Sequence, residues 1–324
     1  MKAIRAHEFG GPQVLRLDDI PDPEPGSGEV VIDIRAAGVN PADTYMRGGA
    51  YAIKPPLPYI PGGDAAGVVS AVGRGVKAFK EGDRVFTGPG LGLGMTGCYA
   101  EKVVRMAVEV QHLPRGVDFS EAAAVGVPYA TAHDALFARG GAKKGETVFV
   151  HGASGSVGTA AIQLAERAGL TVIGSGGSER GRELIASEGA DLVVDHTAPG
   201  YLDAVKRFTA GTGPDLILEM LANVNLAADM DIAAKYGRIV VIGNRGEITV
   251  NPRVAMMKEL DIRGIALWNQ PPAALRGMMA DIMAGLQEGS LRPIVGREMP
   301  LADAAEAHVA VLQPGAYGKI VLVP

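Results

Sequence analysis

Two patterns of hydrophobic and polar positions divide the chain. From the N-terminus to about residue 120, short apolar and β-branched runs alternate with Pro and Gly clusters. These runs are AIRAHEF, EVVIDIRAAGVN, GVVSAVG, DRVFTG and YAEKVVRM. Many short strands separated by turns predict an antiparallel barrel or sandwich-like β domain.

The pattern changes at about Ser120. The segment SEAAAVGVPYATAHDALFARG predicts one or two helices, and the next 120 or so residues alternate short apolar strands with amphipathic helices. In VGTAAIQLAERAG, for example, small and apolar residues recur on one helical face. The expected strands are Thr147–Val150, Thr171–Ile173, Asp191–Val194, Asp215–Leu218, Arg238–Ile242 and Ile262–Leu267. This alternation predicts a doubly wound α/β domain, a parallel sheet covered on both faces.

The C-terminal segment is too short to form a domain of its own. It reads as a helix over 271–289, a second helix over 301–312 and a strand over 318–323. We expect it to rejoin the first domain. The predicted organisation is therefore a catalytic domain of residues 1–122 and 270–324 around an inserted nucleotide-binding domain of residues 123–269.

Composition narrows the class of protein. Hydrophobic residues make up 47% of the 324 residues, which indicates a packed globular protein. The net charge of −5 disfavours a nucleic-acid binder. No uncharged run reaches membrane-spanning length, the N-terminus lacks the apolar stretch of a signal peptide, and the one cysteine, Cys98, forms no intrachain disulfide. We expect a cytoplasmic protein without a membrane anchor.

The turn after the first α/β strand carries the cofactor prediction. In Thr147-Val-Phe-Val-His-Gly-Ala-Ser-Gly-Ser-Val-Gly158, a strand leads through a glycine turn into a helix. Gly155 allows a pyrophosphate to approach the backbone, and Gly158 allows the helix to pack on the strand. The helix N-terminus offers N–H groups to the phosphates, so the turn predicts dinucleotide binding, with an unliganded tight turn as the alternative.

The end of the second α/β strand bears on the choice between NAD and NADP. An NAD site usually carries Asp or Glu there, whereas this chain reads Ser175-Gly-Gly-Ser-Glu-Arg180. A small neutral pocket followed by Arg180 and Arg182 favours the 2′-phosphate of NADPH. Two alternatives remain: Glu179 turns back toward the ribose, or both arginines are solvated residues of a helix start.

Several longer stretches resemble one family. They are EFGGPQVL, AAGVNPADTYMRGGAY, PPLPYIPGGDAAGV, VHGASGSVG, LILEMLANVNLAADM and VVIGNRGEITVNPR. Through them the chain resembles, almost end to end, the zeta-crystallin-like quinone oxidoreductases of the medium-chain dehydrogenase/reductase superfamily. The resemblance implies an α/β fold with a GroES-like β domain and a doubly wound Rossmann domain, and NADPH-dependent reduction of quinones without zinc.

Residues at the expected metal positions agree with a zinc-free site. Zinc-dependent relatives place a cysteine where this chain has Asn40, and a His-Glu pair in the turn that reads Pro61-Gly-Gly-Asp64 here. No two of the six histidines lie within fifteen residues of each other, and one cysteine cannot build a four-cysteine zinc lobe. Without a Lewis acid an alcohol is a poor hydride donor, so we expect a conjugated acceptor such as a quinone or an enone.

The resemblance also implies site residues. Tyr45 is expected to line the nicotinamide pocket with Asn40 one turn before it, both as catalytic residues; a half-buried packing role is the alternative for Tyr45. Tyr51 and Tyr59 are weaker candidates for the substrate rim. His196 has a helix-start role as its alternative, and Lys319 either reaches the pyrophosphate or is a surface lysine. The implied cofactor-binding residues are Tyr45, Ser154, Gly155, Ser156, Val157, Gly177, Arg180, His196, Asn225, Ile242, Gly243, Asn244, Arg245, Ile265, Ala266 and Leu267; no metal ligand is expected.

The sequence is also compatible with other functions. An NADPH-dependent enone or alkenal reductase is the nearest alternative function, and a non-catalytic NADPH-binding or RNA-binding protein is a remoter one. The Gly88–Cys98 connection looks longer than in the family, which bears on substrate preference.

Because the strand IRGIALW ends the sheet with one arginine and no proline, we also expect a homodimer joined through this edge, a tetramer being the alternative.

Overall fold

The computed structural model describes residues 1–52, 54–89 and 97–324, which divide into two units. The first unit comprises Met1–Val127, Pro293–Gln313 and Gly318–Pro324, and the second comprises Pro128–Arg292 and Pro314–Tyr317. The chain thus leaves the first unit and returns to it, but residues 270–292, which we expected in the first domain, belong to the second. The reason is α9 (Pro272–Glu288), whose Asp281 and Glu288 pair with Arg167 of α4 (Ser156–Arg167).

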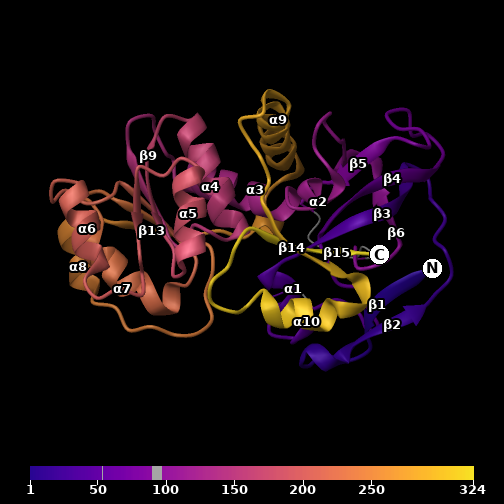
Figure 1. Cartoon of the computed structure of the whole chain (residues 1–324), viewed down its shortest axis with the longest axis horizontal. Coiled ribbons are helices and arrows are strands. Elements are labelled where there is room, and N and C mark those ends of the chain that lie inside the picture. Colours follow the sequence, from indigo (N-terminus) through magenta and orange to yellow (C-terminus); the bar gives the residue numbers. More distant parts are fainter. Residues whose placement is uncertain (53, 90–96) are drawn as a thin grey trace. The chain divides into compact units, whose positions relative to one another are not determined.

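The first unit is built on a seven-stranded sheet. Its strand order is β14-β15-β3-β4-β5-β7, with β6 also paired to β3, and β1 and β2 form a separate two-stranded sheet. All of these pairs are antiparallel except β14 with β15, so C-terminal strands complete an N-terminal sheet (Figure 1). The strands are β1 Lys2–Ala6, β2 Leu15–Asp19, β3 Glu29–Val39, β4 Asp64–Val72, β5 Arg84–Thr87, β6 Lys102–Met106, β7 Val110–His112, β14 Val295–Pro300 and β15 Lys319–Val323.

Short helices complete this unit. They are α1 Pro41–Arg47, α2 Phe119–Ala122 and α10 Ala304–Ala310. The helix expected over 301–312 begins as a 3-10 turn at Leu301–Asp303 before α10. Inward-facing residues of β3, including Val30, Ile32 and Ile34, form the main core together with residues of β15 and α10.

The second unit is a six-stranded parallel sheet in the order β10-β9-β8-β11-β12-β13. The strand order reverses between β8 and β11, which is the switch point of a doubly wound fold. The strands are β8 Thr147–Val150, β9 Thr171–Ser175, β10 Leu192–Val194, β11 Leu216–Glu219, β12 Arg238–Val241 and β13 Asp261–Gly264. The predicted strands are all present, but the last ends at Gly264, because the chain enters a 3-10 turn at Leu267–Asn269.

Both faces of this sheet are buried, as its apolar strands predict. Phe149, Ile173 and Ile217 pack into one core cluster with residues of the helices, and their strand neighbours, such as Val148 and Val172, are equally buried. Each such side chain contributes about 1.5–3 kcal/mol. The remaining helical segments are α3 Gly126–His133, which begins in the first unit, the π-helical Asp134–Arg139, α5 Glu179–Ser187, α6 Tyr201–Phe208, α7 Ala222–Ile232 and α8 Pro252–Lys258 (Figure 1).

Candidate functional site

The cofactor residues predicted in the second unit follow the carboxyl ends of its parallel strands. Ser154–Val157 follow β8, Gly177 and Arg180 follow β9, His196 follows β10, Asn225 follows β11, Ile242–Arg245 follow β12, and Ile265–Leu267 follow β13. Carboxyl ends of parallel strands meet at one edge of a sheet, where doubly wound folds bind dinucleotides. The fold therefore brings these residues to the expected edge.

The glycine turn has the geometry that its sequence predicts. Gly152 has φ +55°, a left-handed conformation that favours glycine, and Gly155 is the N-cap residue of α4. A side chain at Gly158 would place its Cβ 2.5 Å from the Ala153 Cα, so the helix packs closely on the turn. The Ser154 hydroxyl donates to the Ala316 carbonyl at 2.7 Å, which holds the turn against residues 314–317.

The end of β9 carries no acidic side chain, and its two arginines differ. The Arg180 guanidinium lies 3.9 Å from the centre of the Tyr317 ring and the residue is exposed. Arg182 pairs with Asp195 at 2.9 Å. The basic pair expected from the sequence is therefore reduced to one arginine, Arg180, because Asp195 already neutralises the other.

Further predicted residues contact one another or the turns around them. A Cβ at Gly177 would lie 2.7 Å from the His196 Nε2, so the imidazole packs on this glycine. His196 is exposed as a residue, but partial desolvation of its imidazole lowers the pKa of that ring. α6 begins only at Tyr201, so His196 does not stand at the start of a helix. The Asn225 amide donates to Glu219, and the Asn244 amide donates to the Gly246 carbonyl.

In the first unit, the side chains of Asn40 and Asp64 contact the ammonium group of Lys319. The Lys319 ammonium donates to the Asn40 Oδ1 at 2.6 Å and to the Asp64 Oδ2 at 2.9 Å, and the Asn40 Nδ2 also donates to the Asp64 Oδ2 at 2.9 Å. All three side chains are buried, with Lys319 only 1% exposed. Of the two alternatives for Lys319, the surface lysine was wrong, because the side chain is buried and Asp64 neutralises its ammonium inside the unit.

This cluster does not fit a zinc ion. Zinc takes Cys, His and carboxylate ligands, and a cation cannot share the space between Asn40 and Asp64 with the Lys319 ammonium. The one cysteine, Cys98, is buried and accepts from Arg105 at 2.9 Å. We therefore derive no step through a metal at this position.

A second carboxylate lies beside this cluster. Asp43 caps the start of α1 by accepting from the Asn40 backbone N–H at 2.8 Å, and the Tyr99 hydroxyl donates to it at 3.1 Å. Burial raises the pKa of Asp43 to about 7, and the negative charge of Asp64 adds to the rise. The sequence did not single out Asp43 or Tyr99, although both fix the helix that carries Tyr45.

The three candidate tyrosines have different surroundings. Tyr45 and Tyr51 are half-buried, and burial raises the pKa of Tyr51 to about 12. Tyr59 is 9% exposed and packs in a small core cluster with Ala6 and Val14. This burial favours a packing role for Tyr59 over a place at the substrate rim.

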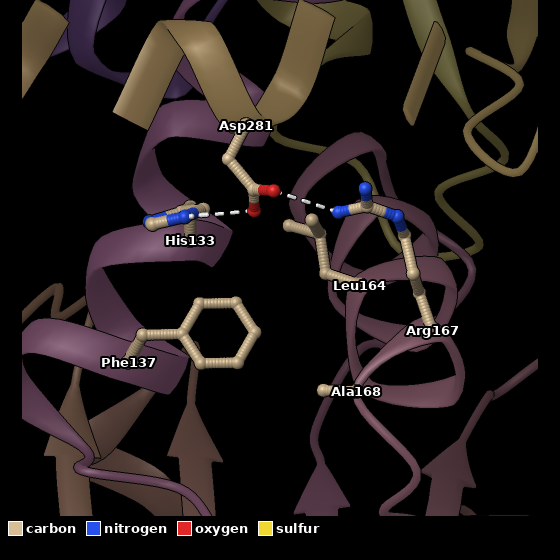
Figure 2. Close-up of a pocket in the computed structure, with 6 residues that line it drawn as sticks. All are labelled: His133, Phe137, Leu164, Arg167, Ala168 and Asp281. Atoms are coloured by element: carbon tan, nitrogen blue, oxygen red, sulfur yellow. Dashed lines mark hydrogen bonds and ion pairs between the residues drawn. The ribbon is translucent and has the colours of Figure 1, made fainter. Parts of the chain in front are cut away.

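A pocket of about 500 Å³ lies elsewhere on the second unit and contains none of the predicted site residues. Asp281 bridges the His133 Nε2 at 3.2 Å and the Arg167 guanidinium at 2.8 Å, above Phe137 and Leu164 (Figure 2). Arg167 is the last residue of α4, at the opposite end from the glycine turn. Because these charges neutralise one another, we assign no ligand to this pocket.

The Gly88–Cys98 connection, predicted to bear on substrate choice, lies outside the described residues except at its ends, 88–89 and 97–98. The sequence also missed a group in the second unit: His151, Glu219 and Asp229 are fully buried and lie close together.

Comparisons with known proteins agree with this architecture. Residues 26–115 match the alcohol dehydrogenase GroES-like domain, and residues 156–284, which include most of α9, match the zinc-binding dehydrogenase family. Human quinone oxidoreductase is 44% identical over 325 aligned residues, which cover 100% of this chain and 98% of the relative.

Solved structures extend the comparison to the whole fold. An NAD-dependent alcohol dehydrogenase superimposes with a TM-score of 0.92 at 32% identity, and a mycobacterial protein complexed with NADPH superimposes with a TM-score of 0.90 at 31% identity. Each covers 100% of both chains. The predicted fold class, a GroES-like β domain with a doubly wound Rossmann domain, is confirmed.

Proposed function

Because this chain belongs to the zeta-crystallin-like quinone oxidoreductases of the medium-chain dehydrogenase/reductase superfamily, we propose that it transfers a hydride from NADPH to a quinone without a metal ion. The observation that carries the metal-free reaction is the Lys319 ammonium between Asn40 and Asp64. Without a Lewis acid, nothing lowers the pKa of an alcohol substrate. A quinone spreads the incoming charge over its own oxygens, so it needs only orientation and a proton.

The second unit supplies the proposed cofactor site. NADPH, when bound, supplies the hydride. The N-terminus of α4 at Ser156 and Val157 offers backbone N–H groups and a partial positive charge to the pyrophosphate. Arg180 is exposed and has no carboxylate within ion-pair distance among the described residues, which supports its role with the 2′-phosphate. We keep the remaining predicted residues of this edge as the lining of the cofactor site.

The first unit supplies the proposed acceptor site. Tyr45 orients the acceptor or relays a proton through its hydroxyl, in line with its half-buried position on α1. The Asn40 side-chain amide already accepts a hydrogen bond from Lys319 and donates one to Asp64. We therefore assign Asn40 a positioning role at the start of that helix. Tyr51 remains a candidate residue for the rim of the substrate site.

We also propose a homodimer. β13 is the terminal strand of the six-stranded sheet and pairs only with β12 among the described strands. Its free edge exposes backbone N–H and C=O groups that a second copy would satisfy across a two-fold axis. Ile262 is 43% exposed, in agreement with a surface that becomes covered. A sedimentation mass equal to one 33.5 kDa chain at micromolar concentration would refute this assembly.

No helix within the described ranges is long and apolar enough to cross a bilayer. We propose a cytoplasmic location, in line with the single cysteine, Cys98, which is buried and forms no disulfide.

A steady-state screen tests the proposed activity. Purified protein is assayed with NADPH and NADH against quinones and enones, and with NAD⁺ and NADP⁺ against alcohols. We expect the highest kcat/KM for NADPH with a quinone. A preference for an enone would move the assignment to the alternative reductase, and NAD⁺-dependent alcohol oxidation as the main activity would contradict the proposal.

A further inference from the structure

Three titratable side chains meet in the interior of the second unit. His151 follows β8, Glu219 ends β11, and Asp229 lies on α7; none is more than 3% exposed. The His151 Nε2 lies 2.8 Å from the Asp229 Oδ1 and 3.4 Å from the Glu219 Oε2. One nitrogen or oxygen atom from each residue lies within 4.8 Å of the others.

Glu219 connects this group to two segments of the proposed cofactor site. Its Oε1 accepts from the Leu221 backbone N–H, in a short contact, and from the Asn225 amide at 3.2 Å. Its backbone carbonyl accepts from the N–H groups of Ile242 at 2.8 Å and Gly243 at 3.2 Å. Asn225, Ile242 and Gly243 are all proposed cofactor residues, so one glutamate fixes the loops that follow both β11 and β12.

The second oxygens of the two carboxyl groups lack donors. Neither the Glu219 Oε2 nor the Asp229 Oδ2 has a hydrogen-bond partner within the described part of the chain. No lysine or arginine pairs with either residue there, and the His151 Nε2 carries only one hydrogen. Two bare carboxylates so close together in a buried site repel strongly, and a single proton between them removes the repulsion and satisfies both oxygens.

The surroundings favour this proton. Burial raises the pKa of Glu219 and of Asp229 to about 7 each, and burial lowers the pKa of His151, which keeps the imidazole neutral. The other titratable groups that face the group are Tyr201 of α6 and His196 after β10. Burial raises the pKa of Tyr201 to about 12 and lowers that of His196, so both are neutral near pH 7 and supply no compensating charge.

We propose that His151, Glu219 and Asp229 form a positioning triad that shares one proton between its two carboxyl groups and holds the loops after β11 and β12 in the form that binds the dinucleotide. This inference rests on the proposed function for the identity of the ligand. Loss of the shared proton to solvent leaves two buried anions that repel each other. This repulsion displaces Glu219 and, with it, the loop after β11 that its side chain holds and the loop after β12 that its backbone carbonyl holds.

The sign of the pH effect follows from the raised pKa values. The stabilising, protonated form is fully present at acidic pH and is lost as the pH rises through about 7. If the doubly ionised form bound no cofactor, the apparent Kd for NADPH would rise by up to about tenfold for each pH unit above that point. We expect a rise of roughly tenfold between pH 6.5 and pH 8.5.

The test compares the wild type with Asp229→Asn and Glu219→Gln, in which an amide N–H replaces the shared proton. Asp231→Asn, an exposed position on the same helix, is the matched control. We measure the melting temperature without cofactor and the Kd for NADPH from pH 6 to pH 9. The wild type and Asp231→Asn should lose stability and affinity above pH 7, and both amide variants should show a much smaller loss.

The outcomes separate this inference from the proposed function. If the wild type binds no NADPH at any pH, the proposed function fails, and the melting temperatures still test the triad. Equal pH slopes in the wild type and the amide variants overturn the shared proton. Should both variants fail to fold, a wild-type NADPH affinity that stays constant from pH 6.5 to pH 8.5 overturns it. A rise in wild-type melting temperature with zinc chloride, reversed by a chelator, would instead make the group a metal site.

Discussion

The two units bury carboxylates in opposite ways. In the first, Asp64 accepts from the Lys319 ammonium, the Asn40 amide and the Val127 backbone N–H, and no oxygen of Asp43 or Asp64 is a buried atom without a partner. In the second, Glu219 and Asp229 face each other beside a neutral histidine, and each keeps one oxygen that has no donor among the described residues.

The two clusters compensate their buried negative charge in different ways, so we expect them to respond differently to pH. In the first cluster the Lys319 ammonium compensates the buried negative charge of Asp64 directly, without an added proton. A pair of carboxyl groups that depends on a proton changes its charge near neutral pH. We therefore expect the first cluster to define the acceptor side of the site, and the second to make cofactor binding sensitive to pH.

The largest expected effect comes from removing the cation of the first cluster. Lys319→Met leaves Asp64 buried without a counter-charge, which should lower the free energy of unfolding by about 3–5 kcal/mol. An unpaired buried charge is most costly where the carboxyl group is ionised, so the variant should lose more stability at pH 8 than at pH 5.5. Urea unfolding at both pH values measures this.

The double variant Lys319→Met/Asp64→Asn is the control for that change. It removes the unpaired charge and keeps an oxygen for the Val127 N–H. It should recover part of the lost stability and remove the pH difference. Equal stability of the wild type and Lys319→Met would show that the ammonium does not stabilise the cluster.

A smaller effect concerns two arginines of the second unit, Arg180 and Arg182, which lie on α5 and not beside its buried carboxyl groups. Arg180→Gln should weaken NADPH binding by about 10–100-fold, the cost of one hydrogen bond to a charged group, and leave NADH binding nearly unchanged. Quenching of Trp268 fluorescence measures both affinities. Arg182→Gln is the matched control, because Arg182 already pairs with Asp195. Equal losses in the two variants would show that Arg180 does not select the nucleotide.

The smallest effect is expected at Tyr45. Tyr45→Phe keeps the ring and removes one hydroxyl, so turnover with a quinone should fall by roughly tenfold, or about 1.4 kcal/mol. A less activated enone should lose more, because it depends more on proton delivery. Steady-state kinetics with both acceptors measures the difference. If turnover and NADPH binding both stay at the wild-type level, Tyr45 is a packing residue.

The sequence predicted the parts of the molecule that follow local rules. The glycine turn at Gly152–Gly158 and the strands of the second unit have periodic or spacing signals that depend on few distant contacts. The last strand was predicted to end at Leu267, three residues beyond its observed end at Gly264, because an apolar run does not reveal where pairing with β12 ends. The helix at 272–288 was assigned to the wrong unit, because the ion pairs of Arg167 with α9 join residues more than 100 positions apart.

The buried charges were the hardest to predict. Asn40 and Asp64 stood out by their motif positions, but their partner Lys319 lies 279 residues from Asn40. Glu219 and Asp229 gave one usable signal, an acidic residue at the end of the apolar strand LILE with a second one ten positions later. Only the fold shows that both face His151.

The most direct test of the metal-free reaction is activity after removal of metals. The protein is dialysed against a strong chelator, its zinc content is measured, and NADPH oxidation with a quinone is followed with and without added zinc. We predict full turnover in the metal-depleted protein and no gain from zinc, because the Lys319 ammonium occupies the space between Asn40 and Asp64. Loss of turnover on dialysis, restored by zinc, would contradict this account.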